Sequence, residues 1–118
     1  MQRSFHVQLQ PHGDAALLAV SGELDIATAP ELEQALDQIR PEQCKLVVVD
    51  LRDLQFMDST GLSTLVRAHQ RLSEQDCELT LVKGPTQIQR LLDLTGVTER
   101  LRLASDPDEL LKGRLTGR

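Results

Sequence analysis

The stretch "KLVVVDL", residues 45–51, decides the fold of this chain of 118 residues. Its apolar side chains fall at consecutive positions, so in an extended strand they would point to both faces of a sheet. A strand that is apolar on both faces is covered on two sides, which is most common in parallel sheets. The stretch therefore predicts the central strand of a largely parallel sheet.

Two strands and a helix are expected before this central strand. "FHVQL" at 5–9 alternates apolar and polar residues, and "AALLAVSGEL" at 15–24 follows the turn "PHGD", which predicts a hairpin. From Leu32 to Ile39 the apolar residues recur at helical spacing. Thr28 and Glu31 have the spacing of a capping box that would start this helix.

A second helix is expected after the central strand. A short connection through Asp53 and Phe56 leads to Asp58, where the helix begins and from which it runs to about Glu74. The apolar spacing of its sequence places four residues on one buried face, namely Leu62, Leu65, Val66 and Leu72.

The rest of the chain repeats this alternation of strand and helix. The expected elements are a strand at 77–82, a helix from Gly84-Pro85 to a C-terminal glycine at Gly96, a strand within 100–105 and a helix capped by Asp106. The order predicts a single α/β domain with a mixed, mostly parallel sheet of about five strands and about four helices. Its core spans about 5–112, and the tail 113–118 is expected to be frayed.

The composition limits the possible partners. The chain is 40% hydrophobic, which is enough for one core. Its net charge of −5 gives no excess of positive charge with which to bind nucleic acid. No apolar run approaches the roughly 18 residues that cross a membrane, and the N-terminus lacks the apolar segment of a signal peptide. We therefore expect a cytoplasmic protein that is not inserted in a membrane.

The sequence offers little for catalysis. It contains no phosphate-binding loop, no dinucleotide fingerprint and no G-x-S-x-G nucleophile elbow. His69 follows Ser59 by ten residues along the expected helix, roughly 15 Å away, which is too far for a base. The three histidines and the two cysteines, Cys44 and Cys77, lack ligand spacing. We expect no enzymatic activity, no metal and no cofactor.

The stretch "FMDSTGL", residues 56–62, carries the polar groups of greatest interest. Asp58, Ser59 and Thr60 can cap the free N–H groups of the first helical turn, and Gly61 permits close approach of another backbone. On this spacing alone, the stretch could be a well-capped helix start and nothing more, or a functional site.

Five motifs together resemble a known family. "GELD" at 22–25, "TAPEL" at 28–32, "LVVVDL" at 46–51, "MDSTGL" at 57–62 and "IQRLLDLTGV" at 88–97 have the order and spacing of the STAS domain. The match covers about residues 5–112 and is similar in particular to the stand-alone anti-sigma factor antagonists of bacteria. The resemblance implies a mixed sheet whose helices pack mainly on one side.

The resemblance also implies a mechanism, partner switching. The unmodified antagonist binds an anti-sigma factor that is also a serine kinase, which releases a sigma factor, as in stress responses. Phosphorylation of the serine after Asp58, which here is Ser59, abolishes binding, and a metal-dependent serine phosphatase reverses it. The ATP belongs to the kinase. The implied partner-binding residues are Asp25, Asp58, Thr60, Gly61 and Ser63; the antagonists usually have glycine where this chain has Ser63.

Two other roles fit the same resemblance. The chain could be a small STAS subunit of a membrane lipid-transport complex, in which Ser59–Gly61 would only be a docking loop. It could also be a scaffold subunit of the stressosome type, which would assemble into large particles and elute accordingly.

Overall fold

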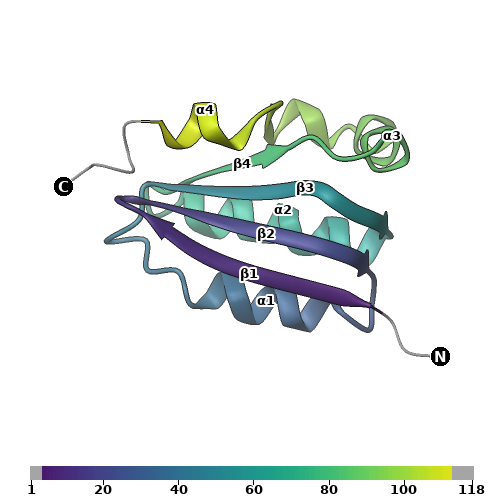
Figure 1. The fold of residues 1–118 in the computed structure, drawn as a ribbon, viewed down its shortest axis with the longest axis horizontal. Coiled ribbons are helices and arrows are strands. Elements are labelled where there is room, and N and C mark those ends of the chain that lie inside the picture. The colour runs from purple at the N-terminus through teal and green to yellow at the C-terminus, as the bar shows by residue number, and fades with distance from the viewer. Residues whose placement is uncertain (1–3, 113–118) are drawn as a thin grey trace.

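The computed structural model of the protein describes residues 4–112 (Figure 1). Within these residues, five strands form one sheet in the order β1-β2-β3-β4-β5; β1 and β2 pair antiparallel, and every other neighbouring pair is parallel. The strands are β1 (Phe5–His12), β2 (Ala15–Leu24), β3 (Leu46–Met57), β4 (Glu78–Val82) and β5 (Arg102–Ala104). The predicted mixed, mostly parallel sheet is confirmed.

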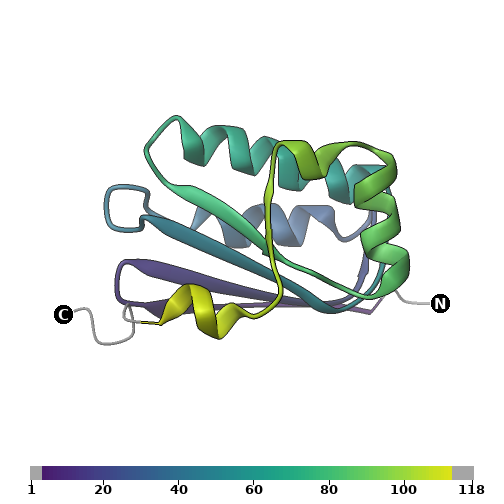
Figure 2. The same cartoon turned by 90° about the horizontal axis from the view of Figure 1, so that it is seen from above.

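Four α-helices and one 3₁₀ turn complete the fold in the part of the chain that the structure describes. They are α1 (Ala29–Asp37), α2 (Ser59–Ser73), α3 (Thr86–Leu94), the 3₁₀ turn η1 (Val97–Glu99) and α4 (Pro107–Leu111). Figure 2 shows α1 and α2 side by side on one face of the sheet and α4 on the opposite face. The helices therefore lie mainly on one side, as the resemblance implied, and α4 is the exception.

The core has two parts, one on each face of the sheet. The larger part joins the sheet to α1, α2 and α3 and includes the fully buried Leu32 and Leu65. The smaller part places Val48 of β3 beneath Leu111 of α4. Since β3 contributes to both parts, the burial of the 45–51 stretch on two sides is confirmed.

One boundary was predicted wrongly. Asp53 and Phe56 do not lie in a connection, because β3 continues through them to Met57. The register of β3 with β2 shifts twice, and each shift adds one extra residue to β3. These bulges change the spacing of the buried residues from two to three, so that Leu51, Leu54 and Met57 face the core. In the sequence, this spacing does not look like a strand.

The other boundaries differ by less. The strand predicted at 5–9 extends to His12, and the hairpin turn is only Gly13 and Asp14. The strand at 15–24, the left-handed Gly96 after α3 and the cap of α4 by Asp106 are confirmed. The tail 113–118 lies outside the described residues.

Candidate docking site at the start of helix α2

Asp58 organises the first turn of α2. It is the N-cap residue, and its Oδ1 accepts hydrogen bonds from the backbone N–H of Thr60 at 2.9 Å and of Gly61 at 3.1 Å. Two of the N–H groups that have no partner within the helix are thereby satisfied. Of the three residues predicted as possible caps, Asp58, Ser59 and Thr60, Asp58 supplies the cap bonds, and these fix the backbone on both sides of the hydroxyl of Ser59.

Ser59 is the first residue of α2 and its side chain is exposed, whereas Thr60 is half-buried. The Ser59 hydroxyl makes no hydrogen bond within residues 4–112, and the cap of the helix is made by Asp58 instead. The hydroxyl of Ser59 is therefore accessible from solvent, and it is not needed to hold the helix.

Gly61 allows α2 to lie against the end of β2. A Cβ atom at this position would come within 2.6 Å of Leu24 Cγ and 3.1 Å of the Leu24 carbonyl oxygen. The backbone N–H of Asp58 also donates to that carbonyl, at 3.2 Å. The prediction that this glycine permits a close approach is confirmed, and the approach brings the β2–α1 turn next to the start of α2.

Asp25 forms the β2–α1 turn. Its side chain is buried, and its Oδ1 accepts from the backbone N–H of Ala27 at 2.9 Å and of Thr28 at 3.1 Å. The Thr28 hydroxyl donates to the Glu23 carbonyl at 2.7 Å and accepts from the Asp25 N–H at 3.0 Å. The predicted capping box of Thr28 with Glu31 is wrong, because the Thr28 hydroxyl is used in the turn and makes no cap bond to α1. Asp25 thus contributes a rigid turn.

Ser63 is exposed one turn into α2, at the edge of a hollow between α2 and the segment around η1. The hollow has a volume of about 530 Å³, and its lining includes the apolar side chains of Val66 and Val97 and the cationic Arg67 and Arg100. The structure therefore places Ser63 beside a concave surface that continues from the start of α2.

The exposed apolar residues at this end of the molecule were not predicted from the sequence. Ile26, between Asp25 and Ala27 of the β2–α1 turn, is 76% exposed, and Leu94 of α3 is 79% exposed. No local pattern could have identified them, since an apolar residue near a helix end is usually part of the core.

The residues expected to be inert in catalysis lie apart from Ser59. His69 is half-buried within α2, and burial raises the pKa of the Cys77 thiol to about 12, so the thiol stays protonated at neutral pH.

Within residues 4–112, no group of three or more His, Cys, Asp and Glu side chains could hold a metal ion. None of the helices in that range is both long and apolar enough to span a bilayer.

Comparisons with known proteins agree with this fold. The model of the STAS domain matches residues 6–110. An anti-sigma-B factor antagonist of Staphylococcus epidermidis is 34% identical over 100 residues, which are 85% of this chain and 93% of that protein. The crystal structure of an anti-sigma factor antagonist from Mycobacterium paratuberculosis has a TM-score of 0.83 and 28% identity over 94% of each chain.

The phosphorylated form of the Bacillus cell fate determinant SpoIIAA shares the fold, with a TM-score of 0.69 and 16% identity over 89% of this chain and 96% of that one. The chain belongs to the STAS-domain family and groups with its anti-sigma factor antagonists. The resemblance noted in the sequence is confirmed.

Proposed function

We propose that this protein is an anti-sigma factor antagonist that acts in the bacterial cytoplasm by partner switching, with Ser59 as the phosphorylated residue. The unphosphorylated form binds an anti-sigma factor that is also a serine kinase and so releases a sigma factor. The kinase, with its own ATP, phosphorylates Ser59, and a serine phosphatase restores the binding form. The antagonist itself is no enzyme and needs no cofactor.

The observation that carries this proposal is the exposed hydroxyl of Ser59 on a helical turn that Asp58 already holds in place. Because the cap does not depend on the serine, the hydroxyl can be modified without loss of the helix start. The phosphorylated SpoIIAA structure shows that another protein of this fold carries a phosphate.

The electrostatics favour a switch in binding over a change of fold. A phosphate adds about −1.5 to −2 charges at pH 7. The dipole of α2 stabilises an anion at its N-terminus by about 0.3–1 kcal/mol, which offsets part of the repulsion from Asp58. A docked partner, in contrast, would have to remove water from an unpaired dianion, at a cost of about 3–5 kcal/mol. The interface therefore loses far more than the fold does.

The phosphorylation can be mapped directly. The protein is incubated with the serine-kinase anti-sigma factors of the same bacterium and ATP, and the product is analysed by mass spectrometry. We expect one phosphate, on Ser59, and none on Ser59→Ala. Ser73→Ala is the matched control, because Ser73 is an exposed serine at the other end of the same helix, and this variant should be phosphorylated like the wild type. Phosphate on Thr60 would move the site by one residue. If the Ser59→Ala variant is still phosphorylated and still released from the kinase, Ser59 does not have the proposed role.

A further inference from the structure

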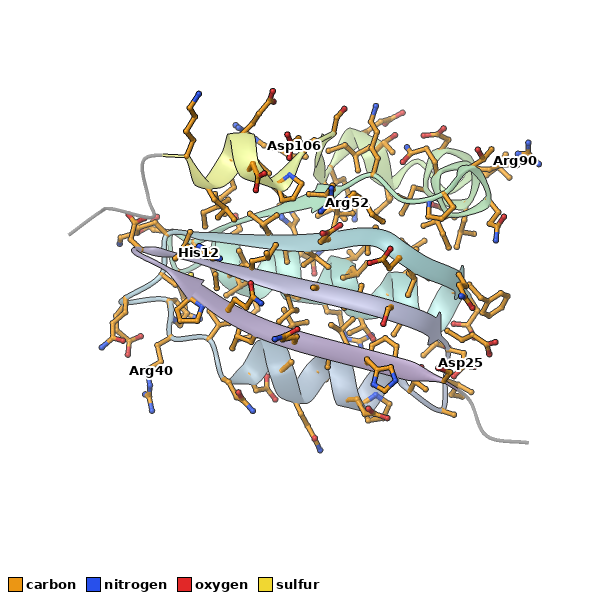
Figure 3. The ribbon with its side chains drawn as sticks, in the orientation of Figure 1. His12, Asp25, Arg40, Arg52, Arg90 and Asp106 are labelled. Carbon is orange, nitrogen blue, oxygen red and sulfur yellow. The ribbon has the colours of Figure 1, made fainter. Side chains whose placement is uncertain are left out.

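Three large apolar side chains are conspicuously exposed among the described residues, and all three lie at one end of the molecule. They are Ile26, at 76%, Phe56, at 45%, and Leu94, at 79%. Ile26 follows β2, Phe56 is near the end of β3, and Leu94 is in α3, which follows β4; the carboxyl ends of these parallel strands share one edge. Figure 3 shows Asp25, which precedes Ile26, and Arg90, which lies one turn before Leu94 in α3, at that end, and His12 and Arg40 at the other.

Ile26 is presented by a turn that cannot easily rearrange. The four hydrogen bonds of Asp25 and Thr28 described above fix the backbone on both sides of it, and the Asp25 carbonyl accepts a further bond from the Ala29 N–H at 2.8 Å. A turn held in this way loses little backbone freedom when a partner covers it, which favours tight binding.

Leu94 is also held on a fixed element. The opposite face of α3 is buried through Ile88 and Leu92, and the side-chain amide of Gln87 donates to the Gln55 carbonyl of β3 at 2.9 Å. The β3–α2 junction, which carries Ser59, therefore lies between the turn with Ile26 on the β2 side and the helix with Leu94 on the β4 side.

We propose that Ile26, Phe56 and Leu94, which we call the apolar edge, form the surface on which the anti-sigma factor docks through an apolar patch of its own. This proposal rests on the proposed function and adds the contacts that supply affinity. A few residues usually carry most of the binding energy of an interface, and the three large apolar side chains exposed at this end of the molecule are the candidates.

The charges near the apolar edge indicate what surrounds the partner's apolar patch. Asp53 and Glu31 are exposed close to the ends of β3 and β2, Asp58 is half-exposed, and the whole chain has a net charge of −5. Arg90, in contrast, is exposed one turn before Leu94. A partner with basic residues beside the part of its patch that covers Ile26 and Phe56 therefore matches this surface. Ser59 lies between the residues of the apolar edge. A partner that covers these residues therefore excludes water from Ser59, and a phosphate on Ser59 would be desolvated on binding.

The test uses the full chain and measures its affinity for the purified serine-kinase anti-sigma factors of the same bacterium. Ile26→Asp should weaken binding by about 30-fold or more, and Leu94→Ser by about tenfold. Ile26→Val keeps the apolar surface and should stay within about threefold of wild type. Gln43→Asp makes the same change of charge in the exposed loop before β3, at the other end of the sheet, and should bind like wild type.

These results separate the two proposals. If phosphorylation of Ser59 abolishes binding while Ile26→Asp or Leu94→Ser binds like wild type, the apolar edge is overturned and the proposed function stands. If the unphosphorylated wild type binds no anti-sigma factor of its bacterium, the proposed function fails and the apolar edge fails with it. Since both substituted side chains are more than three-quarters exposed, their variants should melt like wild type, which a thermal scan verifies.

Discussion

The starts of α2 and α4 use the same local chemistry. Asp58 and Asp106 are both N-cap residues, and each accepts a hydrogen bond at 2.9 Å from the backbone N–H two residues further on. The next residue differs: Ser59 is exposed and carries a hydroxyl, whereas Pro107 is buried and has none. The two helices also differ in length, 15 residues for α2 and 5 for α4.

The comparison shows that an aspartate cap alone does not make a site. At α2 the cap is combined with an exposed hydroxyl, with the close approach of Gly61 to β2, and with the apolar edge on both sides. At α4 the same cap precedes a short helix that covers the second, smaller part of the core. In the proposed function the first helix start contacts a partner, whereas the second helix covers one face of the sheet.

The largest difference in stability is expected between the cores beneath the two helices. Leu65→Ala, in the larger part of the core, should cost about 2–5 kcal/mol of the free energy of unfolding. Leu111→Ala should cost less, because a helix of five residues near the chain end can shift into the gap. Urea unfolding of both variants measures the difference. Equal losses would show that α4 is held as firmly as α2.

A smaller effect is expected from filling the space at Gly61. Gly61→Val would place side-chain atoms where Leu24 packs, since a Cβ alone would be 2.6 Å from Leu24 Cγ. Overpacking of this kind should cost about 1–3 kcal/mol. The control is Ser63→Val, which introduces the same side chain at an exposed position of α2 and should stay within about 0.5 kcal/mol of wild type. If both variants unfold at the same urea concentration, α2 does not depend on its approach to β2.

The smallest of the three effects is expected when the two cap residues themselves are removed. Asp58→Ala should cost about 1–2 kcal/mol, because its carboxylate holds two N–H groups. Asp106→Ala should cost about 0.5–1 kcal/mol, because it holds one, on a short terminal helix. Thermal melting of the two variants ranks them. A larger loss at Asp106 would reverse the comparison between the two helix starts.

Much of the fold could be predicted because its signals are local. The apolar run 46–51 indicates a strand covered on two sides, whatever its neighbours are, and the caps Asp58 and Asp106 act within their own helices. The extension of β3 through Asp53 could not be predicted, because its bulges arise from pairing with β2, which lies far away in the sequence.

The candidate site was predicted in part for the same reason. The cap and the glycine of "MDSTGL" are local features, and the structure shows both where the sequence indicated them. The role of Thr28 was misread, because its hydroxyl turns back to Glu23 when the β2–α1 turn forms. The exposure of Ile26 and Leu94 depends on what the finished fold leaves uncovered, which no spacing in the sequence contains.

The most direct test of the central claim is the affinity of the anti-sigma factor for this protein with and without phosphate on Ser59, measured by calorimetric titration. A penalty of about 3–5 kcal/mol predicts that phosphorylation weakens binding by about 100- to 3000-fold. Ser59→Asp, with one charge, should fall between the two forms, and Ser59→Ala should bind like the unphosphorylated protein.

The melting temperatures of the same samples show whether the added charge or a refolding of the protein causes the loss of affinity. The account predicts that the melting temperature of the phosphoprotein lies within a few degrees of the unmodified form, because Asp58 and not Ser59 caps the helix. Equal affinities for the two forms, or a loss of affinity accompanied by a large fall in the melting temperature, would contradict it.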